Sequence, residues 1–325
     1  MKTALVFGAG GFIGHHLVRR LKFDGLRVRG VDCKLPRWSP SPADDFRLLD
    51  LRDWIETTEA FESWEFDEVY QLAADMGGAG YIFSGENDAD VMDNSAQINL
   101  NVLRCAFDIG VGRIFFSSSA CIYPAHNQAD PLTNTTEEST AYPAEPDSEY
   151  GWEKLFAERL YQAYARNHGL VVRIARYHNV FGPECAWNDG REKAPAAICR
   201  KVAEVPDGGE IEVWGDGQQT RSFLDIDECV VGTLRLMRNE TFAGPVNIGS
   251  DHAISIDDLV RMVADIAGKK IRINHVPGPT GVRGRVSDNR LVRDALHWTP
   301  QGHPFVGLRR LYAWVKEQVD AKVPA

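Results

Sequence analysis

The chain has 325 residues, of which 44% are hydrophobic and 25% are charged, the balance of an ordinary globular protein. This composition excludes a largely disordered, collagenous or disulfide-scaffold protein. Asp and Glu number 46 against 36 Lys and Arg, and the formal charge of -10 argues against a protein that binds nucleic-acid backbones nonspecifically. An anionic ligand would therefore need a local cluster of positive side chains.

The cysteine pattern bears on metal binding and on compartment. The 6 cysteines are scattered and form no CxxC pair, which indicates neither a zinc site nor a redox motif, so no metal is expected. Scattered thiols in a chain of this length are typical of a reducing compartment. We identify no signal peptide and no apolar run of the ~18 residues that a membrane helix needs. We therefore expect a soluble cytoplasmic protein.

The first half of the chain alternates strand-like and helix-like segments. Apolar runs and helical periodicity predict strands at 5–7, 27–32, 46–49, 68–73, 113–118 and 170–175, and helices at 12–21, about 90–109 and about 150–167. Strands that alternate with helices indicate βαβ units with right-handed crossovers. We therefore expect the α/β class and a Rossmann-type, doubly wound parallel sheet.

The rhythm changes beyond residue 176, where Pro and Gly residues divide the chain into shorter pieces. A helix is predicted there from Ser255, whose hydroxyl can cap it, and a strand is predicted at 271–276. We expect two domains. The Rossmann domain would comprise residues 1–175 and about 222–250, and a smaller α/β domain over the carboxyl edge of the sheet would comprise 176–221 and 251–325.

A glycine-rich loop follows the first predicted strand. Gly8, Gly11 and Gly14 have the GxxGxxG spacing, in which glycines permit a tight turn, close approach of a pyrophosphate, and close helix–strand packing. The next helix would direct its N-terminus at the phosphates, with Phe12 and Ile13 in its first turn. The alternative is a glycine-rich turn that binds nothing.

Asp32 ends the next predicted strand, where a carboxylate would bind the adenosine ribose hydroxyls and repel a 2′-phosphate. Lys34 and Arg37 leave NADP open, but the pattern favours NAD. The residues that we expect to contact NAD on these grounds are Gly8, Gly11, Phe12, Ile13, Gly14 and Asp32.

Tyr150 and Lys154 form a YxxxK pair on one face of a predicted helix. A phenol with a pKa of about 10 is a poor base unless a nearby cation favours its anion. Lys154 is such a cation, and a positively charged nicotinamide ring would be another. A chance YxxxK pair is the alternative interpretation.

The glycine loop, the strand that ends in Ser117-Ser118-Ser119 and the YxxxK pair together resemble the extended short-chain dehydrogenase/reductase family, whose members act on nucleotide sugars. The resemblance covers nearly the whole chain. It implies that Ser119, Tyr150 and Lys154 exchange a proton with a sugar hydroxyl while NAD takes the hydride. It also implies that the smaller domain binds the nucleotide sugar. The further cofactor contacts that it implies are Asp50, Leu51 and Ala73.

Two more residues bear on the reaction. Cys121 follows Ser119 closely, and a thiol becomes a base when a neighbouring cation lowers its pKa. Lys193 precedes a predicted helix with Pro195 near its first turn, where the helix dipole disfavours a lysine and would lower its pKa. The alternatives are a buried structural cysteine and a solvated surface lysine.

A more specific resemblance, to the members of this family that invert GDP-mannose at C3 and C5, lies in segments 74–78, 119–124, 190–197, 219–223 and 281–285. It implies that Cys121 acts as base and Lys193 as acid on opposite faces of a 4-keto sugar. The implied product is GDP-L-galactose, with GDP-L-gulose as the singly inverted side product. Residues 83–90 are looser and more polar than the family pattern.

The same resemblance implies the substrate contacts and the assembly. The implied contacts are Gly77, Ser119, Ala120, Cys121, Asn179, Glu192, Lys193, Ala194, Lys201, Gln219, Thr220, Arg221 and Arg285. By family analogy we expect a homodimer through the helices at 90–109 and 150–167. Neither a nucleic acid nor a membrane is expected as a partner.

Two alternatives remain open. Another epimerase of nucleoside-diphosphate hexoses, such as a UDP-hexose 4-epimerase, would not need a base at Cys121. A non-catalytic NAD-binding protein that senses redox state would need neither the proton-transfer residues nor Lys193. No residue pattern identifies a guanine-binding site.

Overall fold

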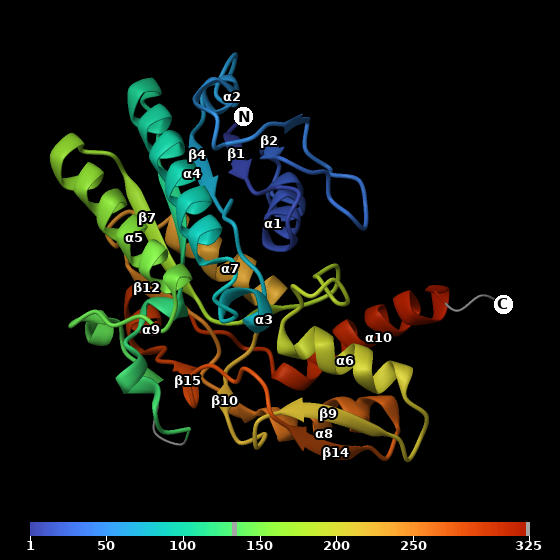
Figure 1. Cartoon of the computed structure of the whole chain (residues 1–325). Coiled ribbons are helices and arrows are strands. Elements are labelled where there is room, and N and C mark those ends of the chain that lie inside the picture. Colours follow the sequence, from blue (N-terminus) through green and yellow to red (C-terminus); the bar gives the residue numbers. More distant parts are fainter. Residues whose placement is uncertain (132–134, 323–325) are drawn as a thin grey trace.

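The computed structural model describes residues 1–131 and 135–322 and places the large sheet in one of two lobes (Figure 1). The sheet has seven strands in the order β12-β7-β5-β4-β1-β2-β3, and every neighbouring pair is parallel. Its strands are β1 (Thr3–Phe7), β2 (Arg27–Asp32), β3 (Asp45–Leu48), β4 (Glu68–Gln71), β5 (Ile114–Ser119), β7 (Val172–Tyr177) and β12 (Val246–Ile248). This arrangement confirms the predicted doubly wound Rossmann sheet.

Helices cover both faces of the sheet, because its strands are apolar on both sides. On one face lie α1 (Phe12–Phe23) and α7 (Ile226–Met237), which share a hydrophobic cluster that includes Leu17 and Leu234. On the other face α4 (Asp88–Ile109) packs against α5 (Glu149–His168), and both contribute to a second cluster. A short helix, α2 (Trp54–Glu59), was not predicted.

The predicted strands and helices of this lobe agree with the structure to within a few residues at their ends. The strand predicted at 68–73 ends at Gln71, and the strand predicted at 170–175 runs from Val172 to Tyr177. Tyr177 pairs with Ser119 of the neighbouring strand, so the end of β7 is fixed by strand pairing that the local sequence does not contain.

The second lobe is built around three helices, α6 (Ala194–Glu204), α8 (Ile256–Ala267) and α10 (Pro304–Lys322), which share one apolar core. Strand β9 (Glu210–Trp214) pairs in parallel with β14 (Arg272–Val276) beside them. The Ser255 hydroxyl accepts a hydrogen bond from the Asp258 amide at 3.0 Å, which confirms the predicted helix cap.

Short elements complete the structure. A four-stranded sheet, in the order β13-β10-β15-β6, contains β13 (Ile254–Ser255), β10 (Thr220–Arg221), β15 (Gly284–Ser287) and β6 (Thr135–Thr136). The remaining elements include α3 (Ala79–Ile82), β8 (Val180–Phe181), β11 (Leu224–Asp225) and α9 (Arg290–Leu296). Within the expected domains, residues 132–134 and 323–325 lie outside the described residues. No helix of the described part is both long and apolar enough to cross a membrane.

The close contact of α1 with the glycine loop after β1 predicts that one methyl group added at Gly14 lowers the stability of the fold. A side chain at Gly14 would overlap the Gly8 carbonyl oxygen, which is backbone and cannot turn aside. We expect Gly14→Ala to lower the free energy of unfolding by about 1–3 kcal/mol, measured by urea denaturation. Gly80→Ala is the matched control, since its new methyl group meets nothing closer than a tryptophan ring atom at 4.0 Å, and it should not destabilise.

Candidate active site

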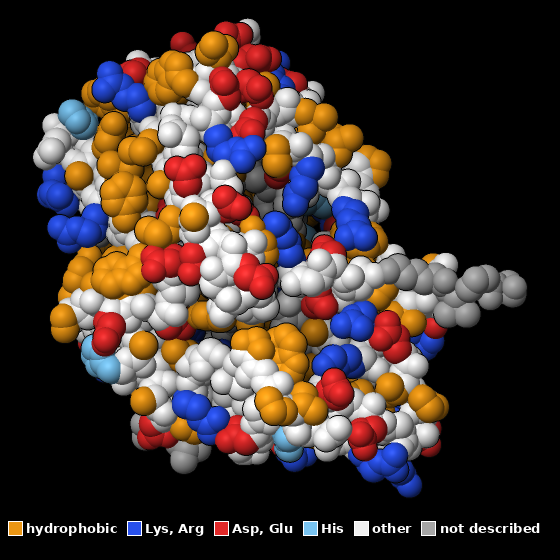
Figure 2. Space-filling model, viewed as in Figure 1, with side chains coloured by type: hydrophobic (Ala, Val, Ile, Leu, Met, Phe, Trp, Pro, Cys, Tyr) orange, Lys and Arg blue, Asp and Glu red, His pale blue; other side chains and the backbone are white. Residues whose placement is uncertain are grey.

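A cavity of about 700 Å³ opens at the carboxyl ends of β1, β2 and β4. The surface is hollowed between the two lobes, and Lys and Arg side chains border the hollow (Figure 2). Ligands of open α/β sheets bind at this edge. The sequence-predicted residues that line the cavity are Gly8, Gly11, Phe12, Ile13, Gly14, Asp32, Asp50, Leu51, Ala73, Gly77 and Lys193.

The glycine loop brings backbone amides to this cavity. Gly8 has a φ of +77°, which makes the tight turn that the sequence predicted. Gly11 precedes α1 without any side-chain cap, so the first amides of the helix are free to bind an anion. Gly10, which the sequence analysis did not select, is equally constrained, because a Cβ there would overlap the Lys34 carbonyl oxygen.

Asp32 lies at the end of β2 and lines the cavity. Its carboxylate accepts hydrogen bonds from the amides of Gly10, at 2.9 Å, and Lys34, at 3.2 Å. Arg37 was one of the two cations that could have bound the 2′-phosphate of NADP. Its guanidinium stacks on the Trp38 ring and pairs with Asp189 at 3.4 Å. The position of this carboxylate fits an adenosine ribose with a free 2′-hydroxyl.

Asp50 is held by its neighbour on the rim of the cavity. Hydrogen bonds from the Arg52 guanidinium hold the pKa of the Asp50 carboxyl below its usual range. Leu51 is buried, and its carbonyl oxygen accepts hydrogen bonds from Thr57 and Asn101. Ala73 lies two residues after the end of β4, and its backbone packs against Gly8.

The predicted proton-transfer residues meet where β5 ends and α5 begins. The Ser119 hydroxyl accepts a hydrogen bond from the Cys121 amide at 3.2 Å, and Ser119 lowers the pKa of the nearby Tyr150 phenol against the effect of burial. The Lys154 ammonium lies 5.7 Å from the centroid of the Tyr150 ring and 5.0 Å from that of Phe116. Tyr150 and Lys154 are both buried, because α5 lies on the sheet along β5.

The electrostatics of Tyr150 differ from the expectation. Burial raises the pKa of the Tyr150 phenol, and the nearby Cys121 and Glu153 raise it further, against the Ser119 hydrogen bond that lowers it. Burial also lowers the pKa of Lys154. Burial is therefore the largest influence on the phenol and acts in the direction opposite to the one expected from Lys154.

Cys121 has the cationic neighbour that a thiol base needs. The Arg285 Nη1 atom lies 3.1 Å from the Cys121 sulfur, and Nη2 donates to the Asp147 carboxylate at 2.8 Å. Arg285 is the register partner of Arg221 on the parallel strands β15 and β10, so the two guanidinium groups come from adjacent strands. Burial, and then Arg285, lower the pKa of Arg221 to about 10.

Lys193 is the residue that precedes α6, as the sequence predicted. Its pKa is lowered, and the main cause is burial rather than the helix dipole that we expected. Cys121 acts on Lys193 in the opposite direction, which places the two groups within electrostatic range of each other. Lys193 lines the cavity together with Gly77.

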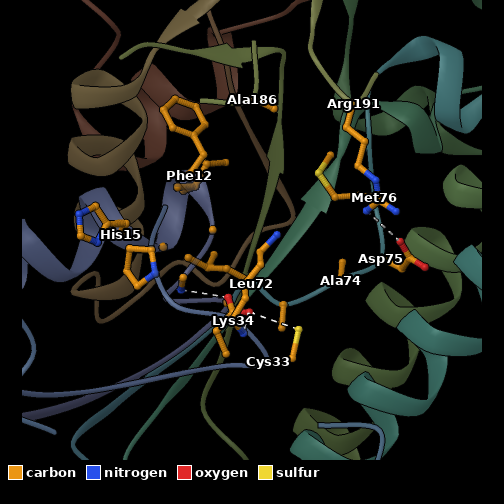
Figure 3. A pocket seen from close by; sticks show the side chains of 18 of the residues that line it. Phe12, His15, Cys33, Lys34, Leu72, Ala74, Asp75, Met76, Ala186 and Arg191 are labelled. Carbon is orange, nitrogen blue, oxygen red and sulfur yellow. Dashed lines mark hydrogen bonds and ion pairs between the residues drawn. The ribbon is translucent and has the colours of Figure 1, made fainter. Parts of the chain in front are cut away.

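The segments around 75–83 and 190–194 cover this side of the cavity. The Arg191 guanidinium lies 4.2 Å from the centroid of the Tyr81 ring and 3.7 Å from an Asp75 oxygen (Figure 3). A Cβ on Gly78 would overlap the Glu192 carbonyl, so the two backbones are in direct contact there. Tyr81 and Phe83 pack with Tyr150 and Cys121 in one apolar cluster.

The other predicted substrate residues are held mainly by hydrogen bonds within the protein. Lys201 does not reach the cavity lining, because its ammonium donates to the Glu212 carbonyl at 2.6 Å. The Glu192 carboxylate accepts from the Gly190 amide and pairs with Arg200. Asn179, Gln219 and Thr220 donate to the carbonyls of Ser222, Trp214 and Pro131 respectively. Ala120 is buried and Ala194 begins α6.

Several residues at the site were not identified from the sequence. They are Gly10, Asp75, Tyr81, Gln128, Asp147 and Arg191. Gly10 and Arg191 lie inside motifs already noted, so those motifs were the available signal. Gln128 and Asp147 have no local signal, because they act through Arg285, which is distant in the sequence. Among the residues described, no group of three or more His, Cys, Asp or Glu could hold a metal ion.

The parallel sheet, the uncapped helix of the glycine loop and the carboxylate at the end of β2 together define an enzyme of the extended short-chain dehydrogenase/reductase type. The sequence profile of the NAD dependent epimerase/dehydratase family matches residues 4–249. The chain belongs to this family, and NAD is its cofactor. The glycine loop and Asp32 are the residues that fit NAD.

Comparison with known proteins narrows the relationship. The chain is 45% identical over 320 residues to GDP-mannose 3,5-epimerase of Arabidopsis thaliana, covering 97% of this chain and 82% of that protein. It is 32% identical over 311 residues to dTDP-4-dehydro-6-deoxy-D-allose reductase of Streptomyces bikiniensis, covering 92% of each.

Solved structures share the fold. UDP-glucose 4-epimerase of Thermotoga maritima, solved with UDP-glucose, has a TM-score of 0.85 at 24% identity and covers 98% of this chain and 99% of its own. UDP-glucose 4-epimerase of Thermus thermophilus, solved in complex with NAD, has a TM-score of 0.83 at 23% identity and covers 97% and 99%. At these identities the likeness is one of fold.

The position of Asp32 predicts a loss of cofactor affinity on its removal. Asp32→Ala removes the charged acceptor that orders the glycine loop, so we expect the Kd for NAD to rise about 10- to 100-fold in calorimetric titration. Asp108→Asn is the control, because it removes a carboxylate whose ion pair with Arg104 is exposed and lies outside the cavity lining, and it should change the Kd little. An unchanged Kd for Asp32→Ala would show that this carboxylate does not bind the cofactor.

Proposed function

We propose that this chain converts GDP-D-mannose to GDP-L-galactose by inverting C5 and C3, with GDP-L-gulose as a side product. The observations that support it most are that Cys121 donates its amide hydrogen to the Ser119 hydroxyl and that Cys121 acts electrostatically on Lys193. A simple 4-epimerisation requires no such additional pair. The 45% identical relative from Arabidopsis thaliana is a GDP-mannose 3,5-epimerase.

The first step concerns the C4 hydroxyl of the sugar. NAD, when bound, supplies the oxidation at C4 and the later reduction, so that the cycle has no net redox change. Tyr150, as its phenolate, takes the hydroxyl proton and later returns it, and Ser119 assists by lowering the pKa of the phenol. Lys154 contributes a buried positive charge near the tyrosine ring.

The second step inverts carbon. A 4-ketone acidifies the hydrogens on C3 and C5, and inversion requires that a proton leave one face and another arrive on the opposite face. Cys121 is the base, and the Arg285 guanidinium lies 3.1 Å from its sulfur. Lys193 is the acid, because burial lowers the pKa of its ammonium and eases proton release.

Arg221 and Arg285 are the substrate's diphosphate contacts in this proposal. They come from adjacent strands and form a local positive pair in a chain with a formal charge of -10. Guanidinium groups bind phosphate oxygens in pairs. The remaining predicted sugar contacts, among them Gly77 and Asn179, stay predictions. The 6 cysteines are free, which supports a reducing compartment such as the cytoplasm.

We also propose a homodimer through α4 and α5. Hydrophobic side chains gather on the surface over these helices (Figure 2), among them Leu100, Trp152 and Phe156, which are 43%, 41% and 47% exposed. Trp152 and Phe156 are one turn apart on α5 and lie on the same face. An exposed apolar stripe of this kind is typical of a protein–protein interface.

Substitution of Cys121 tests the proposed function. Purified protein should convert GDP-mannose to a mixture that yields L-galactose and L-gulose on hydrolysis and chromatography. We expect Cys121→Ala to lower that turnover by at least about 100-fold. Cys105→Ala, a buried cysteine on α4 away from the site, should retain it. Turnover of UDP-glucose but not GDP-mannose, unaffected by Cys121→Ala, would favour a UDP-hexose 4-epimerase instead.

Substitution of Phe156 tests the dimer. Wild-type protein should elute at twice the mass of one chain in size-exclusion chromatography with light scattering. Phe156→Glu should elute at the mass of one chain, because a charge would be desolvated at the centre of the stripe. Trp54→Glu, at an apolar residue on α2 that is 45% exposed, should remain a dimer. A wild-type monomer would contradict the proposed assembly.

A further inference from the structure

The charge of Lys154 poses a problem of solvation. Only 2% of this side chain is exposed, and burial disfavours its ammonium form. A buried cation persists only when an anion or hydrogen-bond acceptors compensate it. The carboxylates that favour its charge are Glu153 and Glu158, both on the same helix, α5.

Glu158 is already matched to another cation. Its two oxygens accept hydrogen bonds from Nε and Nη2 of Arg176 at 2.9 and 2.8 Å, and Oε1 also accepts from the Ser118 hydroxyl at 2.5 Å. Both members of this ion pair are buried. The negative charge of Glu158 therefore balances the positive charge of Arg176, and Lys154 needs a different partner.

Glu153 is the remaining buried carboxyl group beside the lysine. It is 1% exposed, and its Oε1 accepts a hydrogen bond from the Asn99 amide at 2.9 Å. Its Oε2 is buried with no hydrogen-bond partner in the described part of the chain. Asn99 is itself fixed by the Gln71 amide at 3.1 Å and the Tyr161 hydroxyl at 3.4 Å, so the carboxyl group is held in one position.

We propose that Glu153 is the charge partner of Lys154: its ionised carboxylate, fixed by Asn99 and with one oxygen free, keeps the buried ammonium protonated. The two groups form no ion pair within the described residues, so the interaction acts through space inside the protein, where charges are weakly screened. The burial that raises the pKa of Glu153 is opposed first by Lys154 and then by the Asn99 hydrogen bond. Each group therefore favours the charged form of the other.

The neighbouring elements present no competing charge. From α5, Glu158 faces the lysine but is paired, and burial raises the pKa of the Tyr150 phenol, which favours its neutral form. From β5, the Phe116 ring and the Ser118 hydroxyl are neutral, and Arg176 of β7 is paired with Glu158. From α4, Asn99 is neutral. Glu153 is thus a positioning residue that sets the charge of Lys154.

The test measures the titration of Lys154 by NMR and does not depend on enzymatic activity. In protein labelled with ¹³Cε-lysine, the Lys154 resonance is identified by its absence in Lys154→Arg. We expect Glu153→Gln to lower the titration midpoint of Lys154 by about one pH unit or more. Tyr161→Phe is the control, since it alters the same buried cluster without removing a charge, and it should leave the midpoint in place. An unchanged midpoint in Glu153→Gln would overturn the proposal.

A second measurement uses the wild-type chain, so the proposal remains testable if Glu153→Gln does not fold. In protein labelled with ¹³Cδ-glutamate, Glu153 should be ionised at pH 7, and a protonated Glu153 at that pH would overturn the proposal. The importance of the Lys154 charge for catalysis rests on the proposed function. The two titrations, of Lys154 and of Glu153, test the proposal whether or not that function is correct. If the chain acts on GDP-mannose, the alkaline limb that disappears in Lys154→Arg should move to lower pH in Glu153→Gln.

Discussion

The contact between the Arg285 guanidinium and the Cys121 sulfur is the interaction on which the site depends. Cys121 follows β5 of the large sheet, whereas Arg285 lies on β15 of the four-stranded sheet. The same guanidinium binds Asp147, just before α5. One side chain therefore joins the thiol to the start of the helix that contains Tyr150 and Lys154, and it places a positive charge beside the sulfur.

Burial governs the other ionisable groups. It raises the pKa of Tyr150 and lowers those of Lys154 and Lys193, so each group is biased toward its neutral form before any partner acts. Specific partners oppose this bias: Ser119 for the tyrosine, and the buried carboxylates Glu153 and Glu158 for Lys154. A dry site makes such partners effective, because weak screening enlarges their influence.

The sequence predicted what depends on local pattern. The strands and helices around the large sheet, the turn at Gly8 and the Ser255 cap all follow from periodicity and residue type within a few positions. What it could not predict depends on contacts between distant segments. The cation beside Cys121 is 164 residues away, and the lowered pKa of Lys193 comes from burial rather than from its place at the helix start.

Resemblance was also an incomplete guide to individual contacts. The Lys201 ammonium, expected at the substrate, donates to the Glu212 carbonyl at 2.6 Å, and its contact with the substrate stays a prediction. The GxxGxxG pattern selects Gly8, Gly11 and Gly14 but not Gly10. The Lys34 carbonyl nevertheless approaches Gly10 so closely that no side chain fits there. Steric limits of this kind become visible only when the loop and the following strand end are placed together.

The central claim is that a transient 4-ketone lets protons leave and return at two carbons. It is tested most directly by proton NMR of GDP-mannose incubated with the purified protein in D2O without added coenzyme. The account predicts deuterium at both C3 and C5 as GDP-L-galactose appears. A spectrum that stays unchanged, also after NAD is added, or conversion of the sugar without deuterium at C3 and C5, would contradict it.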